Sequence, residues 1–321
     1  MLLTNSEYKR GPSHLIGGQL QTLVPGIWRK IKGVSYERER IILSDSDFLD
    51  LDWIHKDSSK LIILSHGLEG SSNSHYVLGA AKYFSEKDWN VLAWNCRSCS
   101  GEMNNTFKLY YHGDTEDIGA VINHAIGLNK YKEILLVGYS MGGAMLSKYL
   151  ALKANNCPSE IIGGVSISAP YDLRASIGAV EKKSNWIYNY SFKTKIIKKI
   201  RAYNEKFPNR LDLKYLKVST KWSVFDEAYS IKLNGFDKLD DFYDSASCKN
   251  FMHTVKTPLL LVTALNDPII PSTCINYEQI KRHKYIDIEY PSQGGHVGFT
   301  QGSLTNSWME ARVEQFYQGL S

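Results

Sequence analysis

The sequence has little cysteine and no long hydrophobic run, and both shortages limit the kind of protein it encodes. Its 321 residues include five cysteines, an odd number that is mostly scattered along the chain. This pattern favours a reducing compartment over a disulfide framework, so we expect a cytoplasmic protein. No uninterrupted apolar run approaches ~18 residues, the length typical of a membrane-spanning helix. The first seven residues also lack the basic start and apolar core of a signal peptide.

Signals for metal and nucleotide binding are missing as well. The histidines and cysteines do not have the paired spacing of metal ligands, and no phosphate-cradling loop of the Walker type is present. Cys96 and Cys99 form a single Cys-x-x-Cys pair, which we interpret as two structural thiols after a strand. No internal repeat occurs at solenoid or propeller periods. We therefore expect no metal and no cofactor.

Positive charge is concentrated in one segment. The chain carries a formal net charge of +5, and residues 181–206 hold eight lysines and arginines against Glu181 and Glu205. No recognised nucleic-acid-binding motif accompanies this segment, so we expect no nucleic-acid partner. The composition leaves the oligomeric state open.

Short β-type runs alternate with helical patterns through most of the chain. The early runs are 40–44 and 49–53, and the second alternates apolar and acidic residues, as fits an antiparallel pair with one wet face. Later runs are continuously apolar, as strands buried on both faces are. We predict a mostly parallel twisted sheet with helices on both faces, an α/β fold. The later strands are expected at 61–65, 91–94, 134–137, 162–167, 259–263 and 285–289, and the helices near 75–87, 114–128, 141–154, 272–282 and 303–318.

The alternation stops between about Tyr171 and Asn250. This stretch is rich in aromatic and basic residues, and within it Ile196, Ile200 and Tyr203 follow helical spacing up to Pro208. We predict a helical cap inserted between two strands. The expected organisation is a first part of the core over residues 1–170, the cap over 171–250, and the second part of the core over 251–321.

The sequence Gly138-Tyr139-Ser140-Met141-Gly142 matches Gly-x-Ser-x-Gly between a predicted strand and a predicted helix. A serine on such a sharp turn has a strained backbone, and small neighbours let the strand and helix approach each other. Ser140 is therefore the candidate nucleophile. A serine hydroxyl is a weak nucleophile without a base.

The general base is expected after the serine and after the acid in the chain, which leaves His253, His283 and His296. His283 lies in a charged run typical of a solvated helix end, and His253 lies near the end of the cap. His296 sits in a glycine-rich loop after the last predicted strand, so it is the candidate base.

The acid is expected on the loop after the preceding strand, where catalytic groups gather in open α/β sheets. Asp267 lies there, whereas its rival Asp287 lies inside a predicted strand. We interpret Asp267 as the group that orients His296 and stabilises its imidazolium. Two backbone N–H groups are also needed for the tetrahedral oxyanion. We assign them to Met141 and to Leu68, next to Gly67, which permits the turn. His66 is interpreted as a residue that shapes this loop.

With these segments in place, the chain resembles the YheT-like branch of the α/β-hydrolases, which includes bacterial esterases and eukaryotic lipid-active hydrolases. The resemblance extends over nearly the whole chain from about residue 14. Two positions depart from the family pattern: Gln19, where histidine is usual, and Ala144, where asparagine is usual. The matching segments are residues 19–23, 66–71, 95–102, 111–117, 138–143, 225–227, 235–236, 266–268 and 295–296.

The resemblance implies a serine carboxylic-ester hydrolase acting on short- to medium-chain acyl esters or acylglycerol-like lipids. Acyl transfer to an alcohol through the same acyl-enzyme is an alternative, because the outcome depends on which nucleophile reaches the intermediate. A non-catalytic ligand-binding protein on the same fold is another. In the cap, Trp186, Ile187, Tyr188, Tyr190 and Phe192 with nearby lysines suggest transient contact with an anionic membrane surface. The other interpretation of these residues is that they dock the cap on the core.

Overall fold

The computed structural model describes residues 6–8 and 11–320. Met1–Asn5, on which part of the signal-peptide argument rests, lie outside the described residues. Within the described part of the chain, no helix combines the length and apolar character needed to cross a bilayer.

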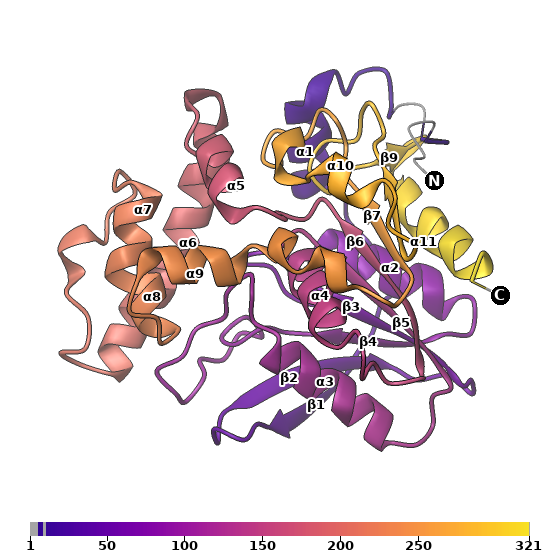
Figure 1. Cartoon of the computed structure of the whole chain (residues 1–321), viewed down its shortest axis with the longest axis horizontal. Helices are drawn as coiled ribbons and strands as arrows, with labels where there is room; N and C mark the ends of the chain where they lie inside the picture. Colours follow the sequence, from indigo (N-terminus) through magenta and orange to yellow (C-terminus); the bar gives the residue numbers. More distant parts are fainter. Residues whose placement is uncertain (1–5, 9–10, 321) are drawn as a thin grey trace.

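An eight-stranded sheet forms the centre of the molecule (Figure 1). Its strand order is β1-β2-β4-β3-β5-β6-β7-β8. The first three strands in this order pair antiparallel, and all later pairs are parallel, which confirms the predicted mostly parallel sheet. The bounds are β1 Glu37–Ile42, β2 Phe48–Ile54, β3 Lys60–Ser65, β4 Asn90–Trp94, β5 Glu133–Tyr139, β6 Ile161–Ile167, β7 Leu259–Val262 and β8 Ile286–Glu289.

Burial explains the contrast between the edge strand and the central strands. β4 and β7 are buried along their whole length, as expected for parallel strands covered on both faces. β1 is a polar edge strand, and its Arg38 and Arg40 lie directly opposite Asp52 and Asp50 of β2. The ion pairs measure 2.8 and 2.7 Å. Opposite charges in register favour this pairing, and a charged edge discourages association with another sheet.

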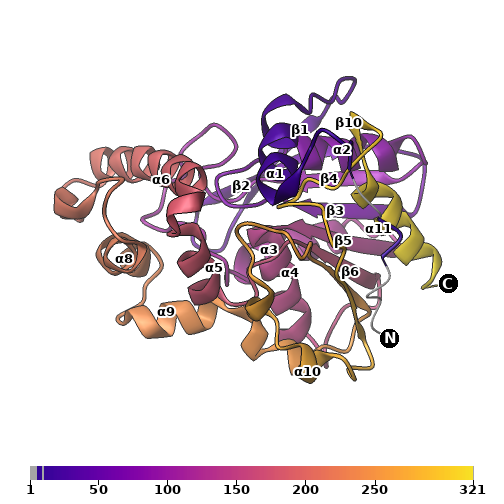
Figure 2. The same ribbon diagram turned by 90° about the horizontal axis from the view of Figure 1, so that it is seen from above.

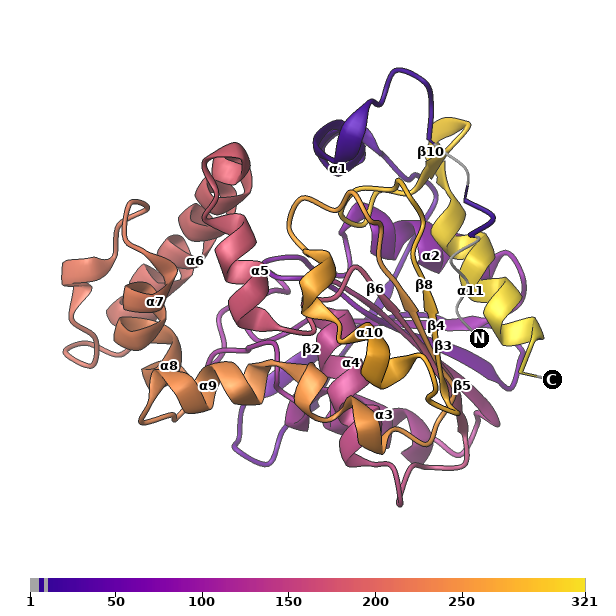
Figure 3. The ribbon, with the colours of Figure 1, turned by 45° about the horizontal axis from the view of Figure 1, so that its top comes forward.

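Helices cover both faces of the sheet (Figure 3). α2 and α11 pack on one face around Val77, Phe84 and Val313. α3, α4 and α10 lie on the other face, where Ile122 and Leu146 belong to the larger core cluster. The bounds are α2 His75–Ser85, α3 Glu116–Gly127, α4 Met141–Leu152, α10 Tyr277–Ile280 and α11 Trp308–Gln318.

The residues between β6 and β7 are helical and project to one side of the sheet (Figures 1 and 2). The longest of these helices, α6 (Trp186–Lys206), buries Ile196, Ile200 and Tyr203, the residues whose spacing predicted it. A π-helical stretch, Asp226–Ser230, joins α7 to α8. The other bounds in this cap are α5 Leu173–Val180, α7 Trp222–Phe225, α8 Ile231–Leu233 and α9 Leu239–Ala246.

Three elements differ from the sequence-based expectation. Helix α1 (Gly17–Trp28) was not predicted, because it contains Pro25 and leaves several apolar residues exposed. The helix expected over 272–282 is broken, with only α10 at its end. The helix expected from residue 303 begins at Trp308, and the polar residues before it form a hairpin of β9 (Thr300–Gln301) and β10 (Ser303–Ser307).

Candidate active site

Ser140 lies on a sharp turn between β5 and α4. Its backbone has φ 52° and ψ −121°, a strained conformation for a residue with a side chain. A Cβ atom on Gly138 would lie 2.4 Å from the Gly142 carbonyl oxygen, and one on Gly142 would lie 2.4 Å from the Ser65 carbonyl oxygen. Both contacts are too short to form, so the two glycines allow the elbow to pack against β3.

The structure brings Ser140, His296 and Asp267 together, although they lie on three separate loops. The Ser140 Oγ atom is 3.0 Å from His296 Nε2, and His296 Nδ1 is 2.9 Å from Asp267 Oδ2. The other oxygen of Asp267, Oδ1, accepts hydrogen bonds from the Ile269 and Ile270 amides at 2.8 and 2.9 Å. These two bonds fix the carboxylate plane, so that Oδ2 points at the imidazole.

Three consecutive amides of the histidine loop are held by side chains from three different segments. The Gly295 N–H donates to Asn266 Oδ1 at 3.0 Å, the His296 N–H donates to Thr22 Oγ1 at 2.8 Å, and the Val297 N–H donates to Ser168 Oγ at 3.2 Å. The loop has left-handed residues at Gly295 and Val297. The side-chain acceptors compensate for the lack of regular secondary structure and fix the position of the imidazole.

Helix α1 connects the loop that carries Asp267 to the loop that carries His296. Gln21 is buried, and its Oε1 atom accepts from Asn266 Nδ2 and from the Gly294 amide, both at 2.9 Å. The contact is close, because a Cβ atom on Gly18 would lie 1.8 Å from the Asn266 carbonyl oxygen. Gln21 and Thr22 belong to a segment that resembles the family, but the sequence alone indicated no role for them. Thr22 and Gln21 position the loops that carry His296 and Asp267.

Gln19, which departs from the family pattern, links α1 to the cap. Its Nε2 group donates to Asn185 Oδ1, and its Oε1 atom accepts from the Tyr188 hydroxyl, both at 2.7 Å. Ala144, the other departure, is completely buried in α4. Gln19 therefore ties the N-terminal helix to the start of α6.

Leu68 and Met141, the predicted oxyanion donors, lie near Ser140: Met141 follows it in the chain, and Leu68 lines the same cavity. Met141 is the first residue of α4, where N–H groups have no partner within the helix. Among the described residues, the Leu68 amide donates to no backbone carbonyl. The left-handed residue of this loop is Glu69, with φ 55°, and not Gly67. Gly67 instead provides space, since a Cβ atom there would lie 3.1 Å from the Ser140 Cβ.

His66 shapes the loop, as expected. Its Nδ1 atom lies 2.7 Å from the Gly67 carbonyl oxygen, and its Nε2 atom accepts from the Cys96 amide at 3.0 Å. Burial lowers the pKa of His66 to about 4, so the ring is neutral with its proton on Nδ1. His283, the rejected candidate for the base, contacts the His253 carbonyl away from the site.

Ser140 lies where two hollows meet. A cavity of about 100 Å³ lies under the cap and is mainly apolar, with Leu173, Ile196 and Ile269 among its walls. An open groove of about 760 Å³ runs along α1 and the loop at residues 67–76 and includes His296 in its lining. Ser140 therefore faces a smaller, more enclosed hollow and a larger, more open one, and apolar surface predominates in both.

The five cysteines are free, with Cys96, Cys248 and Cys274 buried. In the residues that the structure describes, no group of three or more His, Cys, Asp or Glu side chains is arranged to hold a metal ion.

Comparison with known proteins places this geometry in a family. A family model described as the alpha/beta hydrolase fold matches residues 60–302. The chain is 29% identical over 304 residues to the Escherichia coli (strain K12) protein named "Putative esterase YheT", covering 92% of this chain and 88% of that protein. It is 27% identical over 315 residues to human phospholipase ABHD3, covering 94% of this chain and 76% of that protein.

Solved structures agree on the fold. The esterase Pf2001 of Pyrococcus furiosus superimposes with a TM-score of 0.59 at 20% identity and covers 91% of this chain and 98% of its own. Mouse alpha/beta hydrolase domain-containing protein 10 gives a TM-score of 0.58 at 14% identity. The chain therefore belongs to the α/β-hydrolase family, and within it the chain is similar to the esterase- and lipase-like proteins of the YheT branch.

Proposed function

We propose that the protein is a serine carboxylic-ester hydrolase, with Ser140 as nucleophile, His296 as general base and Asp267 as the orienting acid. The observation that carries this proposal is the continuous line of hydrogen bonds from Asp267 through His296 to the Ser140 hydroxyl, at 2.9 and 3.0 Å. It ends at a serine with a strained backbone that faces two hollows.

In the proposed mechanism, His296 Nε2 takes the hydroxyl proton as Ser140 Oγ attacks the ester carbonyl carbon. The carbonyl oxygen becomes an oxyanion and accepts hydrogen bonds from the Leu68 and Met141 amides. His296 then gives its proton to the leaving alcohol, which leaves an acyl-enzyme on Ser140. Water then attacks the acyl carbon while His296 takes a proton from it. His296 returns this proton to Ser140 Oγ as the acid is released.

The two hollows support short- to medium-chain acyl esters or acylglycerol-like lipids as the substrate class. The smaller cavity beneath the cap suits an acyl chain, because its walls are mainly apolar. The open groove suits the alcohol part, since Lys30, Lys32 and Lys195 line it beside neutral polar groups. We propose that residues 171–250 act as the cap that closes the acyl compartment.

The first test is labelling of the wild-type protein and of Ser140→Ala with a fluorophosphonate. The second, on unlabelled samples of both proteins, is hydrolysis of a p-nitrophenyl ester series of increasing chain length. We expect labelling of the wild type alone and a fall in turnover by roughly 10³-fold or more in the variant. A wild type that resists labelling under native conditions would instead favour a ligand-binding protein. Added glycerol distinguishes hydrolysis from acyl transfer, because a transferase would form the glycerol ester.

We also propose transient contact with an anionic membrane surface around the mouth of the groove. Trp186 and Tyr190 at the start of α6 are 64% and 57% exposed, and Trp28 at the end of α1 is 58% exposed. Tyr188 of the same cap segment is buried and docks α6 through Gln19. The exposed aromatic side chains and the nearby lysines together suit an interface with anionic lipid.

Vesicle flotation tests this contact with phosphatidylcholine alone and with phosphatidylcholine containing phosphatidylserine. We expect binding to the anionic vesicles at low salt and loss of binding in a Trp186→Ser, Tyr190→Ser double variant. Failure of anionic vesicles to retain the wild type at low salt, or to raise its activity, would contradict the contact.

The free thiols of all five cysteines support a reducing, cytoplasmic location, which cell fractionation tests.

A further inference from the structure

Lys199 of the cap helix α6 reaches into the core and contacts the loop beside Ser140. Its side chain is 10% exposed, and its Nζ atom lies 2.9 Å from Glu69 Oε1, whose side chain is 7% exposed. The same ammonium donates to Cys99 Sγ at 3.2 Å and to the Tyr110 hydroxyl at 3.4 Å, and it lies 4.7 Å from the centre of the Tyr110 ring. Both side chains are largely shielded from water, so removing either charge leaves the other without a partner of opposite charge.

Glu69 is the residue directly after Leu68, the proposed oxyanion donor. Its φ of 55° is left-handed, a conformation that side-chain contacts must hold for a residue other than glycine. Two contacts to Tyr110 do so. The Glu69 amide donates to the Tyr110 hydroxyl at 3.1 Å, and that hydroxyl donates to Glu69 Oε1. Lys199 holds the same carboxylate oxygen from the cap side.

Contacts between α6 and the loop after β4 fix the position of Lys199. The Tyr203 hydroxyl, one turn further along α6, donates to the Lys108 carbonyl oxygen at 2.9 Å and lies 3.0 Å from Ser98 Oγ. Lys206, at the end of α6, donates to the Asn104 carbonyl oxygen at 2.9 Å. Together with the bond from Lys199 to Cys99, the contacts of Tyr203 and Lys206 attach α6 to residues 98–108 at three positions along the helix.

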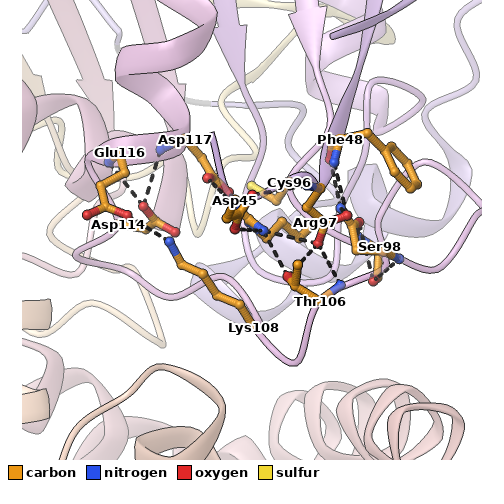
Figure 4. A network of polar contacts seen from close by, with 12 residues as sticks. Asp45, Phe48, Cys96, Arg97, Ser98, Thr106, Lys108, Asp114, Glu116 and Asp117 are labelled. Carbon is orange, nitrogen blue, oxygen red and sulfur yellow. Dashed lines mark hydrogen bonds and ion pairs between the residues drawn. The ribbon is translucent and has the colours of Figure 1, made fainter. Parts of the chain in front are cut away.

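That loop is in turn fastened to the core by a buried network around Arg97 (Figure 4). The Arg97 guanidinium binds both oxygens of Asp117 at 2.8 and 2.9 Å and also binds Asp45 at 2.7 Å. Asp47 accepts from the Asn105 and Thr106 amides. These contacts hold the loop on which α6 is seated, because Arg97 binds two carboxylates and Asp47 accepts from two backbone amides.

From these contacts we infer that Lys199 is a positioning residue: by binding Glu69, it couples the docking of the cap helix to the orientation of the Leu68 amide in the oxyanion hole. This inference rests on the proposed function. Ile196, one turn before Lys199 on α6, lines the acyl cavity, so a helix in contact with the acyl chain also reaches the oxyanion loop. The Leu68 amide then points into the oxyanion hole only when α6 is docked on residues 98–108.

The test compares Lys199→Met with Lys198→Met, which removes a neighbouring exposed lysine of the same helix. Two readouts are used: kinetics on a p-nitrophenyl ester, with inhibition by a trifluoromethyl ketone that forms a tetrahedral adduct, and amide hydrogen exchange of residues 67–71. For Lys199→Met we expect kcat to fall by about 10–100-fold with KM changed less than about threefold. The inhibition constant should rise by a similar factor, and exchange in 67–71 should speed up.

Lys198→Met should match the wild type in both readouts. Glu69→Gln should reproduce the Lys199→Met effects, and adding Lys199→Met to Glu69→Gln should change little further, because the link is already lost. The double variant removes both charges of the ion pair, so neither is left without a partner. It can therefore replace Lys199→Met in the test if that single variant fails to fold. Wild-type exchange and kcat in a folded Lys199→Met or double variant would overturn the inference. Hydrogen exchange needs no turnover, so this result is separate from a failure of the wild type to react with fluorophosphonate.

Discussion

Gln21 and Asn266 are separated by 245 residues in the chain, yet Gln21 Oε1 accepts a hydrogen bond from Asn266 Nδ2 at 2.9 Å. The same oxygen accepts from the Gly294 amide. One buried side chain of α1 thus connects the loop that carries Asp267 to the loop that carries His296. The distance between an acid and its histidine depends on both loops, so this contact bears on the geometry of the proposed catalytic groups.

Gln21→Met should lower kcat by about 10–100-fold with a smaller change in KM. Methionine fills a similar volume but cannot accept the two hydrogen bonds, so the two loops lose their common anchor while Ser140 and the acyl cavity stay in place. Steady-state kinetics on a p-nitrophenyl ester measure the effect. Gln318→Met, at an exposed position of α11, is the matched control. Equal kinetics in the two variants would show that α1 has only a packing role.

Asp267→Asn should reduce kcat by roughly 10³–10⁴-fold while leaving the fold intact. An asparagine amide that faces His296 Nδ1 favours the wrong tautomer and cannot stabilise the imidazolium. The carbonyl oxygen of the new side chain can still accept from the Ile269 and Ile270 amides, which Asp267 Oδ1 binds now. The check is single-turnover kinetics together with a thermal unfolding curve. Activity near that of the wild type would remove Asp267 from the mechanism.

Gly142→Ala should strongly destabilise the protein, by roughly 3 kcal/mol or more, or prevent folding. The new Cβ atom would lie 2.4 Å from the Ser65 carbonyl oxygen and 2.6 Å from the His66 carbonyl oxygen, and neither backbone group can rotate away. Gly127→Ala at the exposed end of α3 is the control, because a Cβ atom there meets nothing within 4 Å. It should be neutral or stabilising by up to about 1 kcal/mol. Urea unfolding of both variants decides, and a stable Gly142→Ala would contradict the steric argument.

The sequence predicted the sheet and the loops of Ser140, Asp267 and His296 because those features depend on local patterns. Continuous apolar runs such as 259–263 mark strands buried on both faces, and glycines mark the elbow and the histidine loop. The α/β-hydrolase fold and its resemblance to the YheT-like branch are confirmed by the comparisons.

Contacts between distant segments could not be predicted from such patterns. Nothing in the composition of α1, with Pro25 inside it, indicates that Gln21 would reach residue 266. Likewise, Lys199 lies among seven other basic residues of the same segment, and its burial against Glu69 depends on how the cap docks. Residues 303–307, the second strand of the hairpin, were mistaken for the start of a helix because a polar strand outside the main sheet lacks an apolar repeat.

A final prediction concerns stability in acid. Burial lowers the pKa of His66 to about 4, from 6.5 in an exposed side chain, and the residue is 1% exposed. Between pH 6.5 and 4 the unfolded chain therefore binds a proton at this position that the native protein does not. The contribution of His66 to stability is present above pH 6.5 and is lost as the pH falls towards 4, with a slope of at most about 1.4 kcal/mol per pH unit.

Asp114 has the opposite effect. Burial, together with the nearby Asp117 carboxylate, raises the pKa of Asp114. The native protein binds a proton here more readily than the unfolded chain does, so this contribution is present at low pH and is lost as the pH rises. The His66 and Asp114 effects partly offset each other in the wild type, and substitutions are needed to separate them.

Urea unfolding at half-unit steps from pH 4 to 7 measures both effects. The free energy of unfolding of His66→Gln, although lower at pH 7 because the bond from the Cys96 amide is weakened, should fall less steeply than that of the wild type as the pH drops. Asp114→Asn keeps an oxygen for the Glu116 and Asp117 amides. Its free energy of unfolding should fall more steeply than that of the wild type as the pH drops. Parallel curves for all three proteins would show that neither group changes its proton affinity on folding.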